Sequence, residues 1–183
     1  FYTIVMQVPQ AEVGLIFGLV RLIDLLVDPL LGYFMDRTRT RWGRRKPWVT
    51  LAVPFILGGV FMLFVPPLEN KGDWVYLTIW AIVAYLAYST IAIAHMSWGA
   101  ELSPDYKERS RIQGAREFAF IFGMLTVLVL PELVALIAPE YFAIGPVGFA
   151  NKVMVMGAFI IIVLPITVVI AWRYVPEPPL VEH

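Results

Sequence analysis

Three ionisable residues interrupt an apolar stretch near the start of the chain: Arg21, Asp24 and Asp28. On insertion scales each would cost roughly 2.5 to 3.5 kcal/mol at the centre of a membrane helix, so they are expected to serve a purpose. Carboxylates at this depth usually face a cavity and bind a proton or another cation on an ion or substrate path. The alternative is a neutral internal network, because Arg21 lies one helical turn from Asp24 and two from Asp28.

These charges share one face of the predicted helix with three glycines, at about 100° per residue. Small residues permit close approach of another helix, so this face is expected to pack tightly. Pro29 directly follows Asp28, and a proline frees a backbone carbonyl one turn upstream, around Leu25, which is a further candidate cation ligand. The three glycines are Gly14, Gly18 and Gly32.

A second set of polar residues lies on later apolar stretches. Arg116 is expected about one turn inside the membrane, where it either extends to the headgroups or projects into a central cavity and binds a polar ligand. His95 and Trp98 are spaced i, i+3 and therefore share a helix face. They are candidates for ligand binding, with a structural histidine and an interfacial tryptophan as the alternative.

The elements that position these residues are predicted to be membrane helices. Of the 183 residues, 60% are hydrophobic and 15% charged, and the mean hydropathy of +0.76 exceeds that of ordinary soluble domains. We predict an all-α integral membrane protein of the inner or plasma membrane, with spans of at least the roughly 20 residues that a bilayer requires. Ser103 is expected to cap the helix that leads into the fourth span. The predicted spans are about 13–35, 47–65, 74–98, 112–138 and 149–172.

The loops between these spans differ in charge. Residues 37–46 contain six Lys or Arg residues, whereas Lys71 and Lys152 lie on the opposite side. Because inner loops are enriched in Lys and Arg, the N-terminus is predicted outside and the tail 173–183 inside. A chain that begins outside without an export signal is easiest to understand if one further helix precedes Phe1.

The basic loop has a pattern more specific than a run of cations, which alone would indicate contact with anionic lipid. Asp36 lies at the end of the first span, where it can hold a cation or a helix N-terminus. Glu101, in the other inner loop, is a second acidic partner. We predict that a charge latch on the cytoplasmic face favours one conformational state. Its residues are Gly32, Asp36, Arg37, Gly43, Arg44, Arg45 and Glu101.

Several function classes are excluded by composition. The chain has no cysteine, and its two histidines, His95 and His183, are too far apart to suggest a metal cluster. No nucleophile–base pair or phosphate-binding glycine loop is present, so we predict that the protein is not an enzyme and needs no cofactor. The segregated charges report membrane topology and do not indicate a nucleic-acid partner.

The motifs together resemble those of one transporter family. The loop pattern is similar to the signature of major facilitator transporters: Gly32-x-x-x-Asp36-Arg37, then Gly43-Arg44-Arg45. The helix pattern more narrowly resembles the glycoside-pentoside-hexuronide:cation symporters: Arg21-x-x-Asp24-x-x-x-Asp28-Pro29-x-x-Gly32 with Arg41-Trp42-Gly43-Arg44-x-Lys46-Pro47-Trp48. The resemblance continues through Trp98-Gly99-Ala100-Glu101-Leu102 and Glu108-Arg109.

This resemblance implies symport of a sugar or glycoside, coupled to H⁺ or Na⁺, by alternating access. It implies that the chain represents helices 2 to 6 of a twelve-helix transporter, whose helix 1 and C-terminal half are then its partners, together with the lipid bilayer. Asp24 and Asp28 match the family's cation positions, and Arg116 and Trp98 its sugar positions, to which we add His95 and Arg21. A sugar-contacting aspartate and a sodium-linked threonine of a familiar member fall at Ala94 and Ile91, so neither galactoside nor sodium is implied.

Two other functions are alternatives to this one. The first is transport of a different cargo, such as a lysolipid, through the same fold. The second is a membrane receptor or assembly subunit that does not transport, for which loss of the buried charges would be expected, whereas Arg21, Asp24, Asp28 and Arg116 are all present.

Overall fold

The computed structural model describes the chain except for residues 68, 70–71, 143–144 and 177–183. The described residues form long α-helices and contain no β-strand, so the prediction of an all-α protein is confirmed. The helices are α1 (Gln10–Arg37), α2 (Lys46–Phe64), α3 (Trp74–Glu101), α4 (Tyr106–Ile137) and α5 (Pro146–Tyr174), with the short 3₁₀ helix η2 (Pro139–Tyr141) between the last two.

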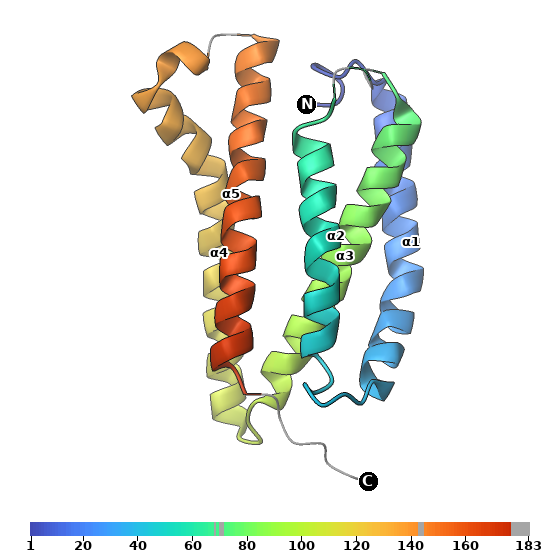
Figure 1. Ribbon diagram of the computed structural model, residues 1–183, viewed down its shortest axis with the longest axis vertical. Helices are drawn as coiled ribbons and strands as arrows, with labels where there is room; N and C mark the ends of the chain where they lie inside the picture. The colour runs from blue at the N-terminus through green and yellow to red at the C-terminus, as the bar shows by residue number, and fades with distance from the viewer. Residues whose placement is uncertain (68, 70–71, 143–144, 177–183) are drawn as a thin grey trace.

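The long helices run roughly along one axis, with α4 and α5 side by side and α1, α2 and α3 forming a second group (Figure 1). α3 packs on α1, α2 and α4, and the contact between α2 and α5 also joins the two groups. By length and composition, α2, α3, α4 and α5 can each cross a membrane. α1 has 28 residues, as α3 does, but it carries three charged residues near its middle.

Side chains next to the helix ends explain where the helices begin. Asp73 caps α3 by accepting hydrogen bonds from the amides of Val75 and Tyr76, at 2.8 and 3.1 Å. Pro47 lies in the first turn of α2, where its missing N–H is not needed. The predicted cap at Ser103 is wrong, because Asp105 caps α4 by accepting from the Lys107 amide at 3.0 Å. The Ser103 hydroxyl lies just before the helix, where it donates to Glu108 and accepts from the Asp105 amide at 3.1 Å.

The closest helix approaches occur at glycines that the sequence pattern did not single out. A Cβ added at Gly59 would lie 2.9 Å from the Ala84 Cβ, where α2 meets α3. A Cβ at Gly157 would lie 2.6 Å from the Phe64 Cβ, where α5 meets α2. The glycines expected to mediate packing of α1 have open space instead, within the part of the chain that the structure describes: Gly14, Gly18 and Gly32.

We expect Gly59→Ala to destabilise the bundle and Gly58→Ala to leave it unchanged or slightly stabilised. The added methyl at Gly59 meets Ala84, including its backbone, whereas nothing lies within 4 Å of the Gly58 position. Overpacking typically costs about 1 to 3 kcal/mol, while Gly to Ala inside a helix gains up to about 1 kcal/mol. Thermal unfolding of the purified protein measures the difference, and equal midpoints for the two variants would contradict this packing.

Candidate functional site

Asp24 is buried between α1 and α3. It is 6% exposed, and its Oδ1 accepts a hydrogen bond of 2.5 Å from the Ser89 hydroxyl. Its Oδ2 accepts from Arg21 Nη1 at 3.1 Å. The Arg21 side chain itself is 79% exposed, so the ion pair reaches from the helix interface to the surface of α1. Both oxygens of Asp24 therefore have donors, as an ionised carboxylate requires.

Asp28 lies one turn further along α1 and differs from Asp24. It is half-buried, and its Oδ1 is buried without a hydrogen-bond partner among the described residues. Arg21 forms its ion pair with Asp24, so the alternative of an internal network describes Asp24 but leaves Asp28 outside it. A buried carboxylate oxygen without a donor is unfavourable unless it binds a proton or a cation. Asp28 therefore has an open position for such a ligand.

A separate cavity of about 750 Å³ lies between α3, α4 and the end of α5. It is near what we call the basic end, the end of the bundle that carries residues 37–46. Its lining is mostly apolar, with polar groups from His95, Arg116 and Glu117 and the ring of Trp98. The structure therefore brings together His95, Trp98 and Arg116, as the sequence analysis expected of a ligand site. Arg21 does not line this cavity.

Trp98 and Arg116 present different groups to the cavity. Trp98 is 3% exposed, and its indole N–H donates to the backbone oxygen of Pro176 at 3.0 Å. Its N–H is therefore already used, and the ring contributes apolar surface to the lining of the cavity. Arg116 forms an ion pair with the adjacent Glu117, while its buried Nε has no partner among the described residues. That N–H can donate to a bound polar molecule.

Lys46 lies at the basic end of the bundle and contacts both Trp98 and Trp172. Its ammonium nitrogen lies 5.4 Å from the ring centroids of both Trp98 and Trp172. It also donates to the Trp172 backbone oxygen at 3.1 Å, where a cation complements the exposed carbonyls at the end of α5. The start of α2 is thereby attached to α3 and α5.

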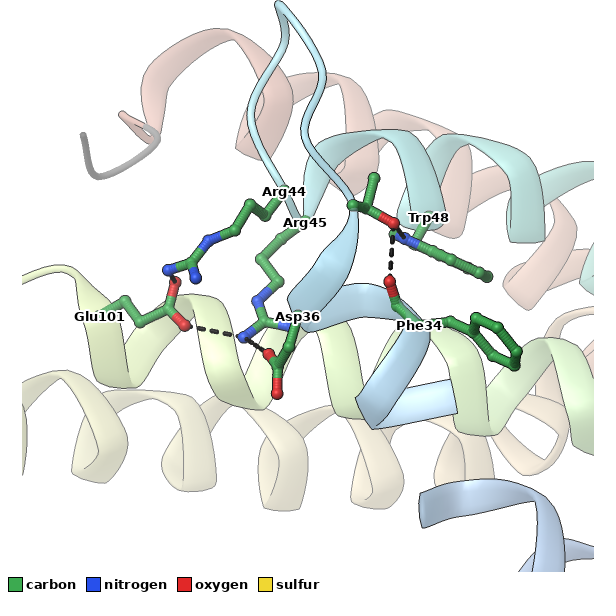
Figure 2. Close-up of polar contacts among 7 residues, drawn as sticks. Phe34, Asp36, Arg44, Arg45, Trp48 and Glu101 are labelled. Atoms are coloured by element: carbon green, nitrogen blue, oxygen red, sulfur yellow. Dashed lines mark hydrogen bonds and ion pairs between the residues drawn. The ribbon is translucent and has the colours of Figure 1, made fainter. Parts of the chain in front are cut away.

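Four of the residues predicted to form a latch contact one another at the basic end, as Figure 2 shows. Arg45 is 4% exposed, and its Nη2 donates to Asp36 Oδ1 at 2.7 Å and to Glu101 Oε1 at 2.8 Å. Arg44 Nη2 donates to the other oxygen of Glu101 at 3.3 Å. Because Asp36 lies in the last turn of α1, Arg45 directly precedes α2 and Glu101 ends α3, this cluster connects the ends of three helices. We call these four residues the latch cluster.

The charge of Arg45 is maintained by its two partners. Burial disfavours its charged form, but the hydrogen bonds and negative charges of Glu101 and Asp36 outweigh burial and raise the pKa of Arg45 above its usual value. Arg45 therefore stays cationic at every physiological pH, and the latch cluster is not opened by its deprotonation.

The remaining predicted latch residues lie around this cluster. Gly43 has a φ of 99°, which glycine adopts without strain. It forms a turn with Thr40, whose backbone oxygen accepts from the Gly43 amide at 3.0 Å. The Arg37 guanidinium lies 4.2 Å from the Tyr33 ring centroid and is not part of the latch cluster. Gly32 has open space around it.

Two residues with side-chain hydroxyl groups, Thr38 and Ser89, make contacts between helices that the sequence did not predict. Thr38 donates to the Phe34 backbone oxygen at 2.8 Å and accepts from the Trp48 indole at 2.9 Å, which joins α1 to α2 beside the latch cluster (Figure 2). The Ser89 hydroxyl also joins two helices, donating to the Asp24 carboxylate across the α1–α3 interface. A single hydroxyl has no periodic signal in the sequence, so neither contact could be predicted from it.

Comparison with known proteins identifies the family. The model of the MFS/sugar transport protein family matches residues 1–179. The chain belongs to this family. MFS denotes the major facilitator superfamily, so the family predicted from the loop and helix motifs is confirmed, as is a membrane location. The description of this family names transport proteins and not enzymes.

Three relatives show how this MFS chain compares with longer proteins. It is 30% identical to the inner membrane symporter YicJ of Escherichia coli K12 over 98% of the chain and 39% of YicJ. It is 30% identical to the putative glycoside/cation symporter YagG of the same organism, over 86% of the chain and 34% of YagG. The isoprimeverose transporter of Lactiplantibacillus pentosus is also 30% identical, over 72% of the chain and 28% of that protein. The chain thus spans well under half the length of these relatives.

Proposed function

We propose that this protein takes part in cation-coupled symport of a sugar or glycoside by alternating access, with H⁺ or Na⁺ as the coupling cation. One observation carries the proposal: on one side of α3 lies a mostly apolar cavity with a few polar groups, lined by His95, Trp98 and Arg116, and on the other side Ser89 contacts the carboxylate of Asp24 on α1. The names of the relatives, which include a glycoside/cation symporter, support the same class.

The cavity has the chemistry that a sugar requires. A guanidinium such as that of Arg116 can donate to neighbouring hydroxyl oxygens. The ring of Trp98 offers an apolar face to the C–H groups of a sugar ring, and His95 can both donate and accept. The cavity volume of about 750 Å³ is within the range of small-molecule sites.

The carboxylates of Asp24 and Asp28 have different roles in the proposed coupling. Asp24 is held by Ser89 and Arg21, so it supplies a fixed negative charge. Asp28 has the open oxygen and binds the cation. Binding neutralises a charge that is costly within the membrane, so a loaded carrier can close around its substrate more readily than an empty one.

Uptake measurements test this proposal. The protein in its native full-length form is reconstituted in proteoliposomes, and labelled pentosides, glucosides and galactosides are offered under an imposed H⁺ or Na⁺ gradient. We expect at least one glycoside to accumulate above its external concentration and to leak out when an ionophore collapses that gradient. Glycoside uptake that never exceeds equilibrium under either gradient would contradict symport.

A lysolipid is the alternative cargo of the same fold. The polar groups of His95, Arg116 and Glu117 in the cavity favour a sugar over an acyl chain. Including a labelled lysophospholipid in the uptake assay separates the two, since transport of that lipid without transport of any glycoside would replace the proposed substrate class. Binding of glycosides without any transport would favour the receptor.

Arg116→Gln should weaken glycoside binding by about tenfold or more, because a hydrogen bond from a charged group contributes about 1.5 to 3 kcal/mol. Arg111→Gln is the matched control, since Arg111 is exposed on the same helix and outside the cavity. Equilibrium binding of the transported glycoside measures both. Equal affinities for the two variants would remove Arg116 from the substrate site.

A further inference from the structure

Ser89 differs from other hydroxyl residues of these helices in what it contacts. Within a helix, a serine or threonine hydroxyl commonly donates to the carbonyl one turn earlier. The adjacent Thr90 does so, donating to the Leu86 backbone oxygen at 2.7 Å. Ser89 instead donates at 2.5 Å to Asp24, a residue of another helix. Its hydroxyl is therefore used between helices and not within its own.

This contact is shielded from solvent at both ends. Ser89 is 5% exposed and Asp24 is 6% exposed. A hydrogen bond with an ionised acceptor is roughly twice as strong as one between neutral groups, and low dielectric strengthens it further. The Ser89–Asp24 bond therefore depends strongly on the charge of the carboxylate.

α3 carries this contact and the cavity residues on different faces. At about 100° per residue, Trp98 is roughly 180° and His95 roughly 120° around the helix from Ser89. Along the axis, the rise of about 1.5 Å per residue places them roughly 9 to 14 Å from Ser89. α3 is a continuous helix over this stretch, so a shift or rotation at Ser89 also displaces His95 and Trp98.

We propose that Ser89 is a positioning residue that links the candidate cation site on α1 to the candidate substrate cavity on the other side of α3. When a cation binds beside Asp24 and Asp28, it withdraws negative charge from Asp24 and weakens the bond to Ser89. α3 is then free to shift against α1, and the cavity residues move with it. This inference rests on the proposed function, because it assigns α3 as the helix through which binding of the cation changes the affinity for the substrate.

The test compares Ser89→Ala, Ser89→Thr and Thr90→Ala in the native full-length protein. The measured quantity is the ratio of the glycoside Kd without and with the coupling cation, which for coupled sites is typically about 5- to 150-fold. Ser89→Ala should reduce this ratio to about twofold or less, because loss of the bond frees α3 as the cation does and brings the Kd without cation close to the Kd with cation. Ser89→Thr keeps a hydroxyl and should restore the ratio, and Thr90→Ala should leave it unchanged.

The outcomes separate this inference from the proposed function. An unmodified protein whose glycoside Kd does not respond to any cation would overturn the proposed function itself. A normal ratio in the unmodified protein and an equal ratio in Ser89→Ala would overturn only the role of Ser89. If Ser89→Ala does not fold, Ser89→Cys keeps the volume with a weaker donor, and a ratio equal to that of the unmodified protein overturns the inference in the same way.

Discussion

Asp28→Asn should abolish cation-driven accumulation of substrate, while exchange of substrate across the membrane continues. Asparagine has nearly the shape of aspartate but neither takes up a proton at neutral pH nor offers a negative charge to a metal cation. Because the Asp28 oxygen has no donor among the described residues, the substitution removes a candidate ligand without breaking a recorded hydrogen bond. The ratio of internal to external substrate should fall to about one, as expected when a substrate equilibrates without coupling.

Loss of folding is not the expected reason for that effect. Removing a charge from the middle of a membrane helix relieves a cost of roughly 2.5 to 3.5 kcal/mol on insertion scales. The Asp28→Asn protein should therefore unfold at the same temperature as the unmodified protein, or higher. Glu12→Gln is the matched control, a carboxylate to amide change in the first turn of the same helix. Undiminished uphill uptake by Asp28→Asn would show that coupling uses another group.

Arg45→Gln should destabilise the protein and change its balance of conformations. One nitrogen of this buried side chain donates to both Asp36 and Glu101, so its loss leaves two carboxylates without their shared cation. Breaking a buried ion pair by removing one partner typically costs about 3 to 5 kcal/mol. We expect a loss near or below the lower limit, because Asp36 is 62% exposed and Arg44 still pairs with Glu101.

Two measurements and two further variants test this expectation. Thermal unfolding reports stability, and the labelling rate of a cysteine introduced at the basic end reports opening on that side. Arg45→Lys should keep part of the stability that Arg45 provides, since an ammonium can also donate to two carboxylates. Arg41→Gln is the control, because Arg41 is exposed and stacks on Trp42 at 5.0 Å. An Arg45→Gln protein with unchanged stability and labelling would mean that the latch cluster does not favour one state.

The sequence predicted the helices well because their signal is additive. Four of the described helices, α2 to α5, contain an apolar run long enough for a bilayer, and no single residue decides whether such a run forms a helix. The ends were less certain, because capping depends on one side chain. Ser103 and Asp105 are both good caps by type. The Ser103 hydroxyl accepts from the Asp105 amide at 3.1 Å, whereas Asp105 accepts from the Lys107 amide inside α4 and is therefore its cap.

In the candidate sites, the contacts between oppositely charged residues could be predicted from the sequence. Asp36, Arg45 and Glu101 are opposite charges at the ends of neighbouring spans, and electrostatic attraction brings them together. The packing face of α1 was mispredicted because a glycine only permits close approach and does not cause it. The partner of a glycine depends on the shape of another helix, as with Gly59 and Ala84, and one sequence does not contain that shape in readable form.

Arg21 also shows that charge contacts can be predicted from the sequence, whereas the orientation of a helix cannot. Its spacing predicted a contact with Asp24, which the structure contains. Its assignment to the substrate site required knowing which way α1 faces, and Arg21 does not line the cavity. Ser89 could not be found at all from the sequence, because its significance comes from the opposing carboxylate and not from its own neighbours.

The two hydrogen bonds of Asp24 also differ in when they can form during synthesis. Arg21 and Asp24 belong to the same helix, so their ion pair can form as soon as α1 enters the membrane. The bond from Ser89 requires α3, which is made 65 residues later. α1 can therefore be inserted with its deepest carboxylate already neutralised locally, and the helices can assemble afterwards around a charge that was never left unpaired.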